Sequence, residues 1–434
     1  MSENIQENKM GVMPVPKLLF NMAIPMVVSM LMQALYNIVD SAFVGMYSTH
    51  ALEAVSIAFP IQNLMIAFAT GTGVGINALL SRHLGEKKFE AADTTANTGL
   101  FLAICSYILF AILGLTIVRP FFSMQSDIAE VVNYGEEYLT VILLCGFGIF
   151  GEITNERLLQ ATGRTVYSMI TQGTGAVLNI ILDPIMIFGY CGMPALGVKG
   201  AAIATVIGQC VAFILALIFN IKVNKEINIR ISKIFKPQLQ EIIKIYEIGI
   251  PSIIMQSIGS IMTYSMNRIL IEFSSTATAV FGVYFKLQSF FFMPVFGLNN
   301  GITPIIAYNY GAQQRNRMIK TIRISLTTAF CLTFIGFLCF EGIPQVLLGM
   351  FNASDAMLKI GVPALRIIGI HYLIAWFCII AGTVFQALGK AVFSMIVSIM
   401  RQLVVLIPSA YILSKIGGLH IVWWAFPIAE VISF

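Results

Sequence analysis

A stripe of polar side chains runs through the first long apolar segment of the chain. Its members are three, four and seven residues from the first, so a helix places them on one face: Gln33, Tyr36, Asn37 and Asp40. A polar stripe in an apolar helix needs a cavity or other helices beside it, not lipid. A carboxylate at membrane depth is costly and usually functional. Asp40 is therefore predicted to bind a proton or a small cation; solvation near a helix end is the alternative.

A second aspartate follows the same pattern in a later apolar segment. Asn179 lies four residues before Asp183, which places both on one helix face, and Pro184 leaves a carbonyl one turn earlier without its helical donor. Carboxylate, amide and carbonyl oxygens are hard ligands that suit H⁺ or Na⁺. We predict an ion site at Asp40, Asn179 and Asp183, with a structural role for Asp183 in hydrogen bonding across helices as the alternative.

The segments that carry these residues have the composition of membrane spans. The chain has 434 residues, 58% hydrophobic and 11% charged, and its mean hydropathy is +0.85. A soluble domain carries about 25% charged residues, so the sequence predicts an all-α polytopic protein of the lipid bilayer. A span needs about 20 apolar residues. Twelve are predicted, at 17–45, 52–80, 95–119, 136–161, 165–190, 198–222, 242–272, 278–308, 320–343, 362–388, 391–414 and 418–434.

The two halves of the chain share a pattern at an offset of 226 residues. Pro25, Gln62, Gly71, Gly75, Gly85, Gln160 and Gly163 recur as Pro251, Gln288, Gly297, Gly301, Gly311, Gln386 and Gly389. Six predicted spans in each half give both halves one orientation, so the repeat is parallel, with a pseudo-two-fold axis along the membrane normal. The expected domains are an N-terminal six-helix bundle (1–222), a linker (223–241) and a C-terminal six-helix bundle (242–434).

Loop charges predict how the chain lies in the membrane. Lysines and arginines gather in the loops on one side of the predicted spans and in the linker, so this side and both termini are expected to be cytoplasmic, in a multi-pass protein of the inner membrane. The net charge of +5 comes from these loops and does not indicate nucleic-acid binding. The linker is expected to form a short amphipathic helix. The last span is short, and its end at Phe434 is interpreted as a truncation.

Residues for catalysis or for a structural metal are not recognisable. The seven cysteines and four histidines are dispersed, and no nucleophile–base pair or phosphate-binding loop is visible. We expect no enzyme activity, no cofactor and no direct use of ATP. Five further charged residues within predicted spans are interpreted mainly as structural or interfacial: Glu152, Glu156, Arg157, Lys286 and Arg401.

A central cavity between the halves is expected to bind small molecules. If spans 1 and 2 pack against spans 7 and 8, the cavity wall would include residues from both halves. The expected wall residues are Gln33, Tyr36, Asn37, Met255, Gln256, Tyr284 and Gln288. Some of the 22 methionines and 32 phenylalanines are expected to adapt the wall to varied ligands.

Several longer motifs resemble the multidrug and toxic compound extrusion (MATE) transporters, in the branch with the bacterial DNA-damage-inducible and staphylococcal multidrug members. They are YNIVDSAFVG at 36–45, NIILDPIMIFG at 179–189, GVKGAAIAT at 197–205, QATG at 160–163 with QALG at 386–389, and PIIAYNYG at 304–311. The resemblance implies two six-helix bundles around a V-shaped cavity. It also implies efflux of organic cations and other drugs in exchange for H⁺ or Na⁺. The residues implied in coupling are Asp40, Asn179, Asp183 and Thr205, and a monomer is expected.

Other classes of membrane protein fit less well. A lipid-linked oligosaccharide flippase of the same superfamily would need several basic residues around a pyrophosphate, and only Lys286 and Arg401 are deep enough. A channel or receptor is disfavoured by the parallel repeat. The sequence leaves the substrate and the choice between H⁺ and Na⁺ open.

Overall fold

The computed structural model describes residues 8–351 and 353–434, and within them the chain is helical without a strand. The N-terminal half contains α1 (Lys9–Val12), α2 (Val15–Tyr47), α3 (Thr49–Gly85), α4 (Phe89–Thr116), α5 (Val118–Gln125), α6 (Ala129–Leu144), α7 (Phe147–Ala161), α8 (Thr165–Phe188), η1 (Tyr190–Gly192) and α9 (Gly197–Lys222). The linker region contains α10 (Ile231–Ile234). The C-terminal half contains α11 (Leu239–Ile271), α12 (Ser275–Gly311), α13 (Arg315–Gly342), α14 (Pro344–Gly349), α15 (Asp355–Gly369), α16 (Tyr372–Ala387), α17 (Ala391–Ile399), η2 (Met400–Leu406), α18 (Ile407–Gly417), α19 (Leu419–Val422) and α20 (Ala425–Ser433).

Eleven of the twelve predicted spans coincide with helices that are long and apolar enough to cross a membrane. Among the described residues, nine segments qualify as continuous helices and two as bent helix pairs. The last predicted span is a shorter apolar segment, Leu419–Ser433, so its crossing stays a prediction. The bundle architecture predicted from the sequence is confirmed, and the linker forms only a four-residue helix.

Two predicted spans are broken, which the sequence analysis missed. α6 and α7 meet at 45°, and α15 and α16 meet at 51°. The breaks, at Gly146 and His371, occupy nearly equivalent places in the two halves. Apolar residues continue through both breaks, so hydropathy could not reveal them.

Helix ends explain part of the 226-residue repeat. The side chain of Ser48 caps α3 by accepting from the His50 N–H, and its repeat partner Ser274 caps α12 by accepting from the Ala277 N–H. Gly163 and its partner Gly389 both have a positive φ, +83° and +79°, in the turns that follow α7 and α16. Glycine adopts this backbone conformation without steric cost.

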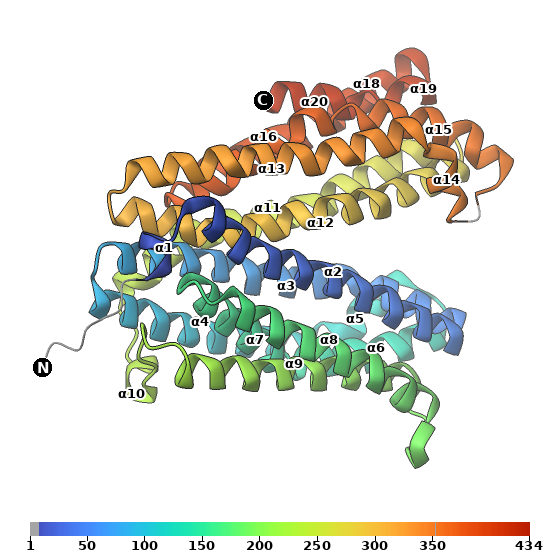
Figure 1. Cartoon of the computed structure of the whole chain (residues 1–434). Helices are drawn as coiled ribbons and strands as arrows, with labels where there is room; N and C mark the ends of the chain where they lie inside the picture. Colours follow the sequence, from blue (N-terminus) through green and yellow to red (C-terminus); the bar gives the residue numbers. More distant parts are fainter. Residues whose placement is uncertain (1–7, 352) are drawn as a thin grey trace, which may run out of the picture.

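The two halves form a V (Figure 1). The N-terminal half is the lower bundle and the C-terminal half the upper one. They meet at the left, where α1 and α10 lie, and they separate toward the right. We call the left-hand end the basic end, because its loops carry Arg82, Lys87, Lys88, Arg315 and Arg317. Three buried clusters cross between the halves: one joins Leu18 and Leu80 to Ile245 and Ile305, a second joins α2 to α12, and a small third one joins α3 to α11 and α17.

Glycines allow the helices of the two halves to touch at backbone distance. A Cβ built on Gly297 of α12 would lie 2.5 Å from the Cα of Val27 in α2, and one built on Gly71 of α3 would overlap Ile253 in α11. These two contacts are related by the repeat, since Gly71 corresponds to Gly297 and Val27 to Ile253. In membranes such small residues let helices pack closely.

Closer to the basic end, the same symmetry continues. A Cβ on Gly85 would overlap the carbonyl oxygen of Tyr308, and one on its partner Gly311 would overlap the carbonyl oxygen of Arg82. The recurring glycines therefore mark the surface on which the halves close.

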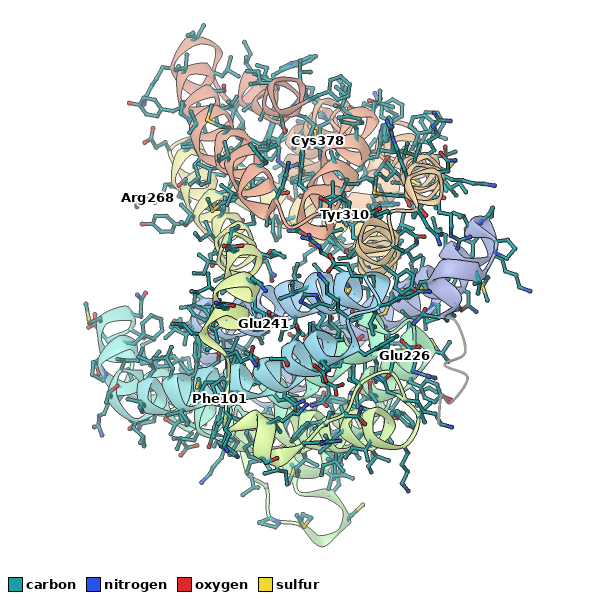
Figure 2. All side chains as sticks on the ribbon, turned by 90° about the vertical axis from the view of Figure 1, so that its left-hand side faces the viewer. Phe101, Glu226, Glu241, Arg268, Tyr310 and Cys378 are labelled. Carbon is teal, nitrogen blue, oxygen red and sulfur yellow. The ribbon has the colours of Figure 1, made fainter. Side chains whose placement is uncertain are left out.

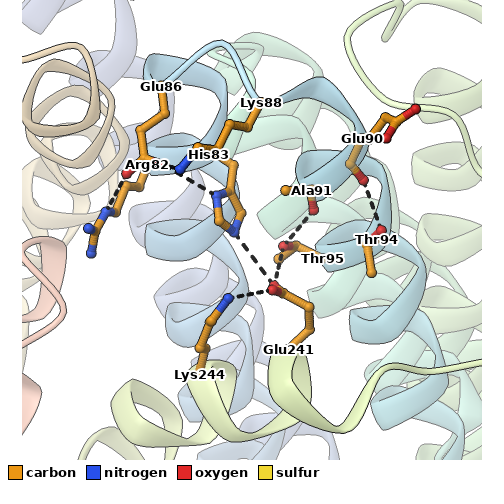
Figure 3. A network of polar contacts seen from close by, with 10 residues as sticks. All are labelled: Arg82, His83, Glu86, Lys88, Glu90, Ala91, Thr94, Thr95, Glu241 and Lys244. Atoms are coloured by element: carbon orange, nitrogen blue, oxygen red, sulfur yellow. Dashed lines mark hydrogen bonds and ion pairs between the residues drawn. The ribbon is translucent and has the colours of Figure 1, made fainter.

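Polar contacts at the basic end join the start of α11 to the N-terminal half (Figure 3). Thr95 Oγ1 donates to Glu241 Oε2 at 3.0 Å, and Lys244 Nζ donates to Glu241 Oε1 at 2.8 Å. The ring of His83 lies 3.6 Å from Glu241 Oε2. Figure 2, seen from the basic end, shows Glu241 where α11 rests on the lower bundle.

The N-terminal segment makes the corresponding contact with the C-terminal half. Arg317 Nη2 donates to the carbonyl oxygens of Met10 at 3.0 Å and Met13 at 2.7 Å. Asn309 Nδ2, at the repeat position of His83, donates to the Met10 carbonyl at 3.2 Å. The N-terminal half thus contacts the start of α11 through Thr95 and His83. The C-terminal half contacts the segment Met10–Met13 through Asn309 and Arg317.

Candidate functional site

A cavity of about 1010 Å³ lies between the two halves. Helices α2, α3, α7, α8 and α9 line it from one side, and α11, α12, α16, α17, η2 and α20 from the other. Five of the predicted wall residues lie on it: Gln33, Tyr36, Met255, Gln256 and Gln288.

The prediction for Tyr284 is wrong. Its side chain is fully buried in the core of the C-terminal half, with ring centroids 5.4 Å from Phe426 and 6.3 Å from Phe340. α13 and α20 cover this turn of α12, so the cavity wall on α12 begins one residue later, at Phe285.

The prediction for Asn37 is also wrong. The wall follows Met26, Met30, Gln33 and Tyr36 along one face of α2. Asn37 lies at the edge of that face and is exposed. The spacing that grouped it with Gln33 was correct, but the cavity wall is narrower than the polar stripe.

The two aspartates are brought together from α2 and α8. The carboxyl groups of Asp40 and Asp183 lie within hydrogen-bond reach of each other. Asp183 is fully buried, and the buried Oδ1 of Asp40 has no hydrogen-bond partner among the described residues. Two ionised carboxylates in contact repel each other strongly. A proton shared between them, or a cation beside both, removes that repulsion.

Asn179 and Thr205 place further side-chain oxygens beside the acid pair. With the Asn179 amide oriented so that its nitrogen donates to Asp183 Oδ2 at 3.2 Å, its oxygen accepts from the Thr205 hydroxyl at 3.1 Å. Both residues are buried on facing helices, α8 and α9. Two carboxylates, an amide oxygen and a hydroxyl suit a hard monovalent cation or a proton. The described residues contain no cluster of three or more His, Cys, Asp or Glu that could hold a metal.

The residues of the predicted ion site adjoin the cavity. Tyr36, Asn179 and Thr205 are part of the wall, and each aspartate lies one helical turn beyond a wall residue of its own helix.

The acids of α7 form a further part of the wall, which the sequence analysis treated as secondary. Glu156 accepts from Thr171 Oγ1 at 2.9 Å. Arg157 Nη1 donates to Gln160 Oε1 and to Asn300 Oδ1 of the other half, both at 2.9 Å. Of the structural and interfacial roles left open for Glu156 and Arg157, burial favours the structural one, because they are only 6% and 8% exposed. α7, the helix after the break, lines the cavity with Glu152, Glu156 and Arg157 among others.

The C-terminal half contributes an ion pair of Arg401 with Glu430, a partner that the sequence analysis did not identify. Arg401 Nη1 donates to Glu430 Oε1 at 3.2 Å, and both side chains line the cavity with His371. Glu430 was overlooked because it is a single acid in a short last segment. The charge of Arg401, alone in an apolar span, was the available signal that a partner existed.

Two like helical bundles, a central cavity and buried acids beside its wall define the class of the protein as a secondary transporter of the membrane. The sequence model of the MatE family matches residues 25–185 and 251–412, so the chain belongs to the MatE family. These two matched segments are the two halves of the repeat.

Curated relatives and solved structures agree with this membership. The chain is 28% identical to the "Multidrug export protein MepA" of Staphylococcus haemolyticus and 27% identical to that of Staphylococcus aureus strain MRSA252, in each case over 96% of this chain and 91% of the relative. A structure described as the "outward-facing conformation of a multidrug resistance MATE family transporter of the MOP superfamily" matches with a TM-score of 0.92 at 25% identity, over 99% of this chain and 96% of the other. A MATE structure in complex with MaL6 matches equally well.

Proposed function

We propose that the protein exports organic cations and other drugs across the inner membrane in exchange for H⁺ or Na⁺. Two findings support the drug substrate: the relatives named as multidrug export proteins and the large cavity with amide, thioether and aromatic walls. The observation that carries the proposed exchange is the contact between Asp40 and Asp183 next to that cavity.

The arrangement of the halves suggests alternating access. In the proposed orientation the basic end faces the cytoplasm, because basic loops are retained there. The closed basic end then corresponds to an outward-open state. The domains act as two rigid bundles (1–222 and 242–434) joined by the linker 223–241, and rocking them about the glycine contacts would open the cavity to the other side.

Ion binding provides the free energy that shifts the equilibrium between the two conformational states. An ion can shift the equilibrium only through a difference in its affinity for the two states. A cation between Asp40 and Asp183 draws α2 and α8 together through oxygen ligands on both helices. Because Tyr36 and Asn179 lie one turn away on the cavity wall, the same movement narrows the cavity beside them. Drug release to the outside would follow from that change.

The test is dye uptake into inverted vesicles, in which export from the cytoplasmic face carries dye into the lumen, driven in turn by a proton gradient and by a sodium gradient. Asp40→Asn and Asp183→Asn each remove one charge with little change in size, and both are expected to abolish gradient-driven uptake at equal expression. Glu53→Gln is the matched control, because Glu53 is an exposed acid at the start of α3. Full uptake with either asparagine variant refutes the proposed ion site.

A further inference from the structure

The linker between the halves exposes basic side chains that lack a partner in the protein. Residues 222–240 contain five basic residues and one acid. The acid is already engaged, because Glu226 Oε2 accepts from Asn8 Nδ2 at 2.6 Å. Lys233 lies 4.0 Å from Asp93 Oδ2 and is still 43% exposed. The other four basic side chains are exposed and form no hydrogen bond or ion pair with residues that the structure describes: Lys222, Lys225, Arg230 and Lys236.

Large apolar side chains are exposed beside these charges. Ile231 and Phe235, four residues apart on α10 and its end, are 75% and 64% exposed. Leu239 and Ile243, four residues apart at the start of α11, are 71% and 50% exposed. Exposed apolar surface rimmed by polar residues marks an interaction site. Apolar side chains flanked by lysines and arginines are typical of a segment that lies in the headgroup layer of a membrane.

The linker is fixed to the N-terminal half, so this surface is preformed. The backbone N–H of Asn228 donates to Asp93 Oδ1 at 2.7 Å, and that of Arg230 donates to Asn97 Oδ1 at 2.9 Å. Asn97 Nδ2 in turn donates to the Asn228 carbonyl at 2.9 Å. Ile234 packs inward against a buried apolar cluster. The inner face of α10 is therefore occupied by the protein, and the outer face is left for another partner.

The position of the linker fits a lipid partner. α10 lies at the basic end, on the side of the N-terminal half that faces away from the C-terminal half (Figure 1). It contacts α4 and lies between the end of α9 and the start of α11, and all three helices are long and apolar enough to cross a membrane. The ends of such helices lie at the level of the lipid headgroups. The exposed apolar face continues along α11 through Ile243 to Ile250, which is 51% exposed.

Other basic loops at the same end lack this combination. Arg82 and Lys88 are both paired with Glu86, at 2.9 Å and 2.8 Å. Lys320 and Arg323 of α13 are exposed, but no large apolar side chain of residues 311–329 is exposed. The linker thus differs from these loops because it combines several unpaired basic side chains with exposed apolar ones.

We propose that the outer surface of the linker binds the headgroups of anionic phospholipids. The lipid phosphate accepts hydrogen bonds from Arg230 and Lys236, while Ile231 and Phe235 contact the glycerol and the upper acyl carbons. A guanidinium suits a phosphate because it can donate two parallel N–H bonds. Basic residues beside a membrane helix each add to the attraction for anionic lipid. This site is separate from the cavity and does not depend on which compound or ion is transported.

The experiment measures which lipid lies next to the linker. A bimane fluorophore is attached to Ser232→Cys, an exposed position beside Ile231, after replacement of the native cysteines. The protein is placed in nanodiscs that contain phosphatidylglycerol, which is anionic, and phosphatidylcholine, which is zwitterionic, and either lipid carries a nitroxide on an upper acyl carbon. Quenching as a function of composition gives the ratio of the phosphatidylglycerol and phosphatidylcholine association constants at the label.

A matched pair of variants separates this site from general attraction to the basic end. The wild-type ratio is expected to be about fivefold or more in favour of phosphatidylglycerol, and Arg230→Gln/Lys236→Gln should lower it by about fivefold or more. Lys320→Gln/Arg323→Gln removes the same charge from α13 and should leave the ratio unchanged. A wild-type ratio near one, or an equal fall in both double variants, overturns the proposal.

Two further arms test the lipid assignment. Ile231→Ser/Phe235→Ser removes the apolar contacts and should reduce quenching by both nitroxide lipids; undiminished quenching would contradict the insertion of these side chains. Excess inorganic phosphate at matched ionic strength should leave the wild-type ratio unchanged. A fall of the ratio to one under phosphate would show a site for the free anion and overturn the assignment to lipid.

Discussion

The glycine contacts between α2 and α12 and between α3 and α11 predict how a single methyl group changes the conformational equilibrium. A Cβ at Gly297 would lie 2.5 Å from the Cα and 2.7 Å from the backbone N of Val27. Carbon atoms in contact prefer about 3.5–4.0 Å, so α2 and α12 would have to separate by about 1 Å. The obstructing atoms belong to backbone, which cannot rotate away as a flexible side chain can.

The added methyl group raises the free energy only of the state in which the two halves are in contact at the basic end. Overpacking of this kind costs about 1–3 kcal/mol, and the state in which the halves part at the basic end is free of it. Gly297→Ala is therefore expected to shift the equilibrium toward that state by about 5-fold to 150-fold. The repeat predicts the same shift for Gly71→Ala, since Gly71 meets Ile253 in the equivalent contact.

The assay is the distance between spin labels on the two halves at the basic end. Glu90→Cys and Asn316→Cys, both at exposed and repeat-equivalent positions, serve as label sites after replacement of the native cysteines. Gly297→Ala should increase the population with a long distance. Gly282→Ala is the control, because it lies on the same helix with no atom within 4 Å of its built Cβ and has the same gain in helix propensity. Identical distance distributions for the wild type and a folded Gly297→Ala protein would refute the reasoning.

Three further predictions concern individual contacts. Thr205→Val removes the hydroxyl bonded to Asn179 and should raise the cation concentration for half-maximal transport by about 2-fold to 10-fold, whereas Thr205→Ser should restore it; equal titration curves would contradict a ligand role. Arg157→Gln breaks the 2.9 Å bond to Asn300 across the halves and should lengthen the same spin-label distance, and an unchanged distance would show that the bond does not hold the halves. Burial alone would raise the pKa of Glu86. Hydrogen bonds from Lys88 and Arg82 outweigh burial and hold the pKa of Glu86 below its ordinary value. The stabilisation from ionised Glu86 is therefore present above about pH 4.5 and lost as the pH falls through the lower folded value. Glu86→Gln should flatten the acid side of the melting-temperature profile, and an unaltered profile would exclude the contribution.

Much of the bundle architecture follows from the sequence because lipid imposes a simple rule on it. Only helices satisfy the backbone in the bilayer, so apolar length predicts spans. The 226-residue repeat adds the pairing of the halves, and the glycines that recur in it, such as Gly71 and Gly297, form the contact surface. The bends before α7 and α16 could not be predicted from apolar length, because apolar residues continue through them.

The candidate site was predictable in composition and less so in geometry. Acids at similar depth suggested that Asp40 and Asp183 belong together, but 143 residues separate them and only the packing of α2 on α8 brings them into contact. Tyr284 shows the opposite failure: its spacing from Gln288 fits the cavity face, yet neighbouring helices cover it. Glu430 carried no local pattern, and its role depends on Arg401 across two helices.

The exchange of ion for drug is tested most directly by running it in reverse. Proteoliposomes receive an outward dye gradient, no ion gradient and no membrane potential, and uptake of H⁺ and of Na⁺ is measured. Dye leaving the vesicles should drive one of these ions inward through the wild type and through Glu53→Gln, and neither ion through Asp40→Asn or Asp183→Asn. Dye efflux with no movement of either ion in the wild type, or equal ion uptake in the aspartate variants, would contradict coupling at this acid pair.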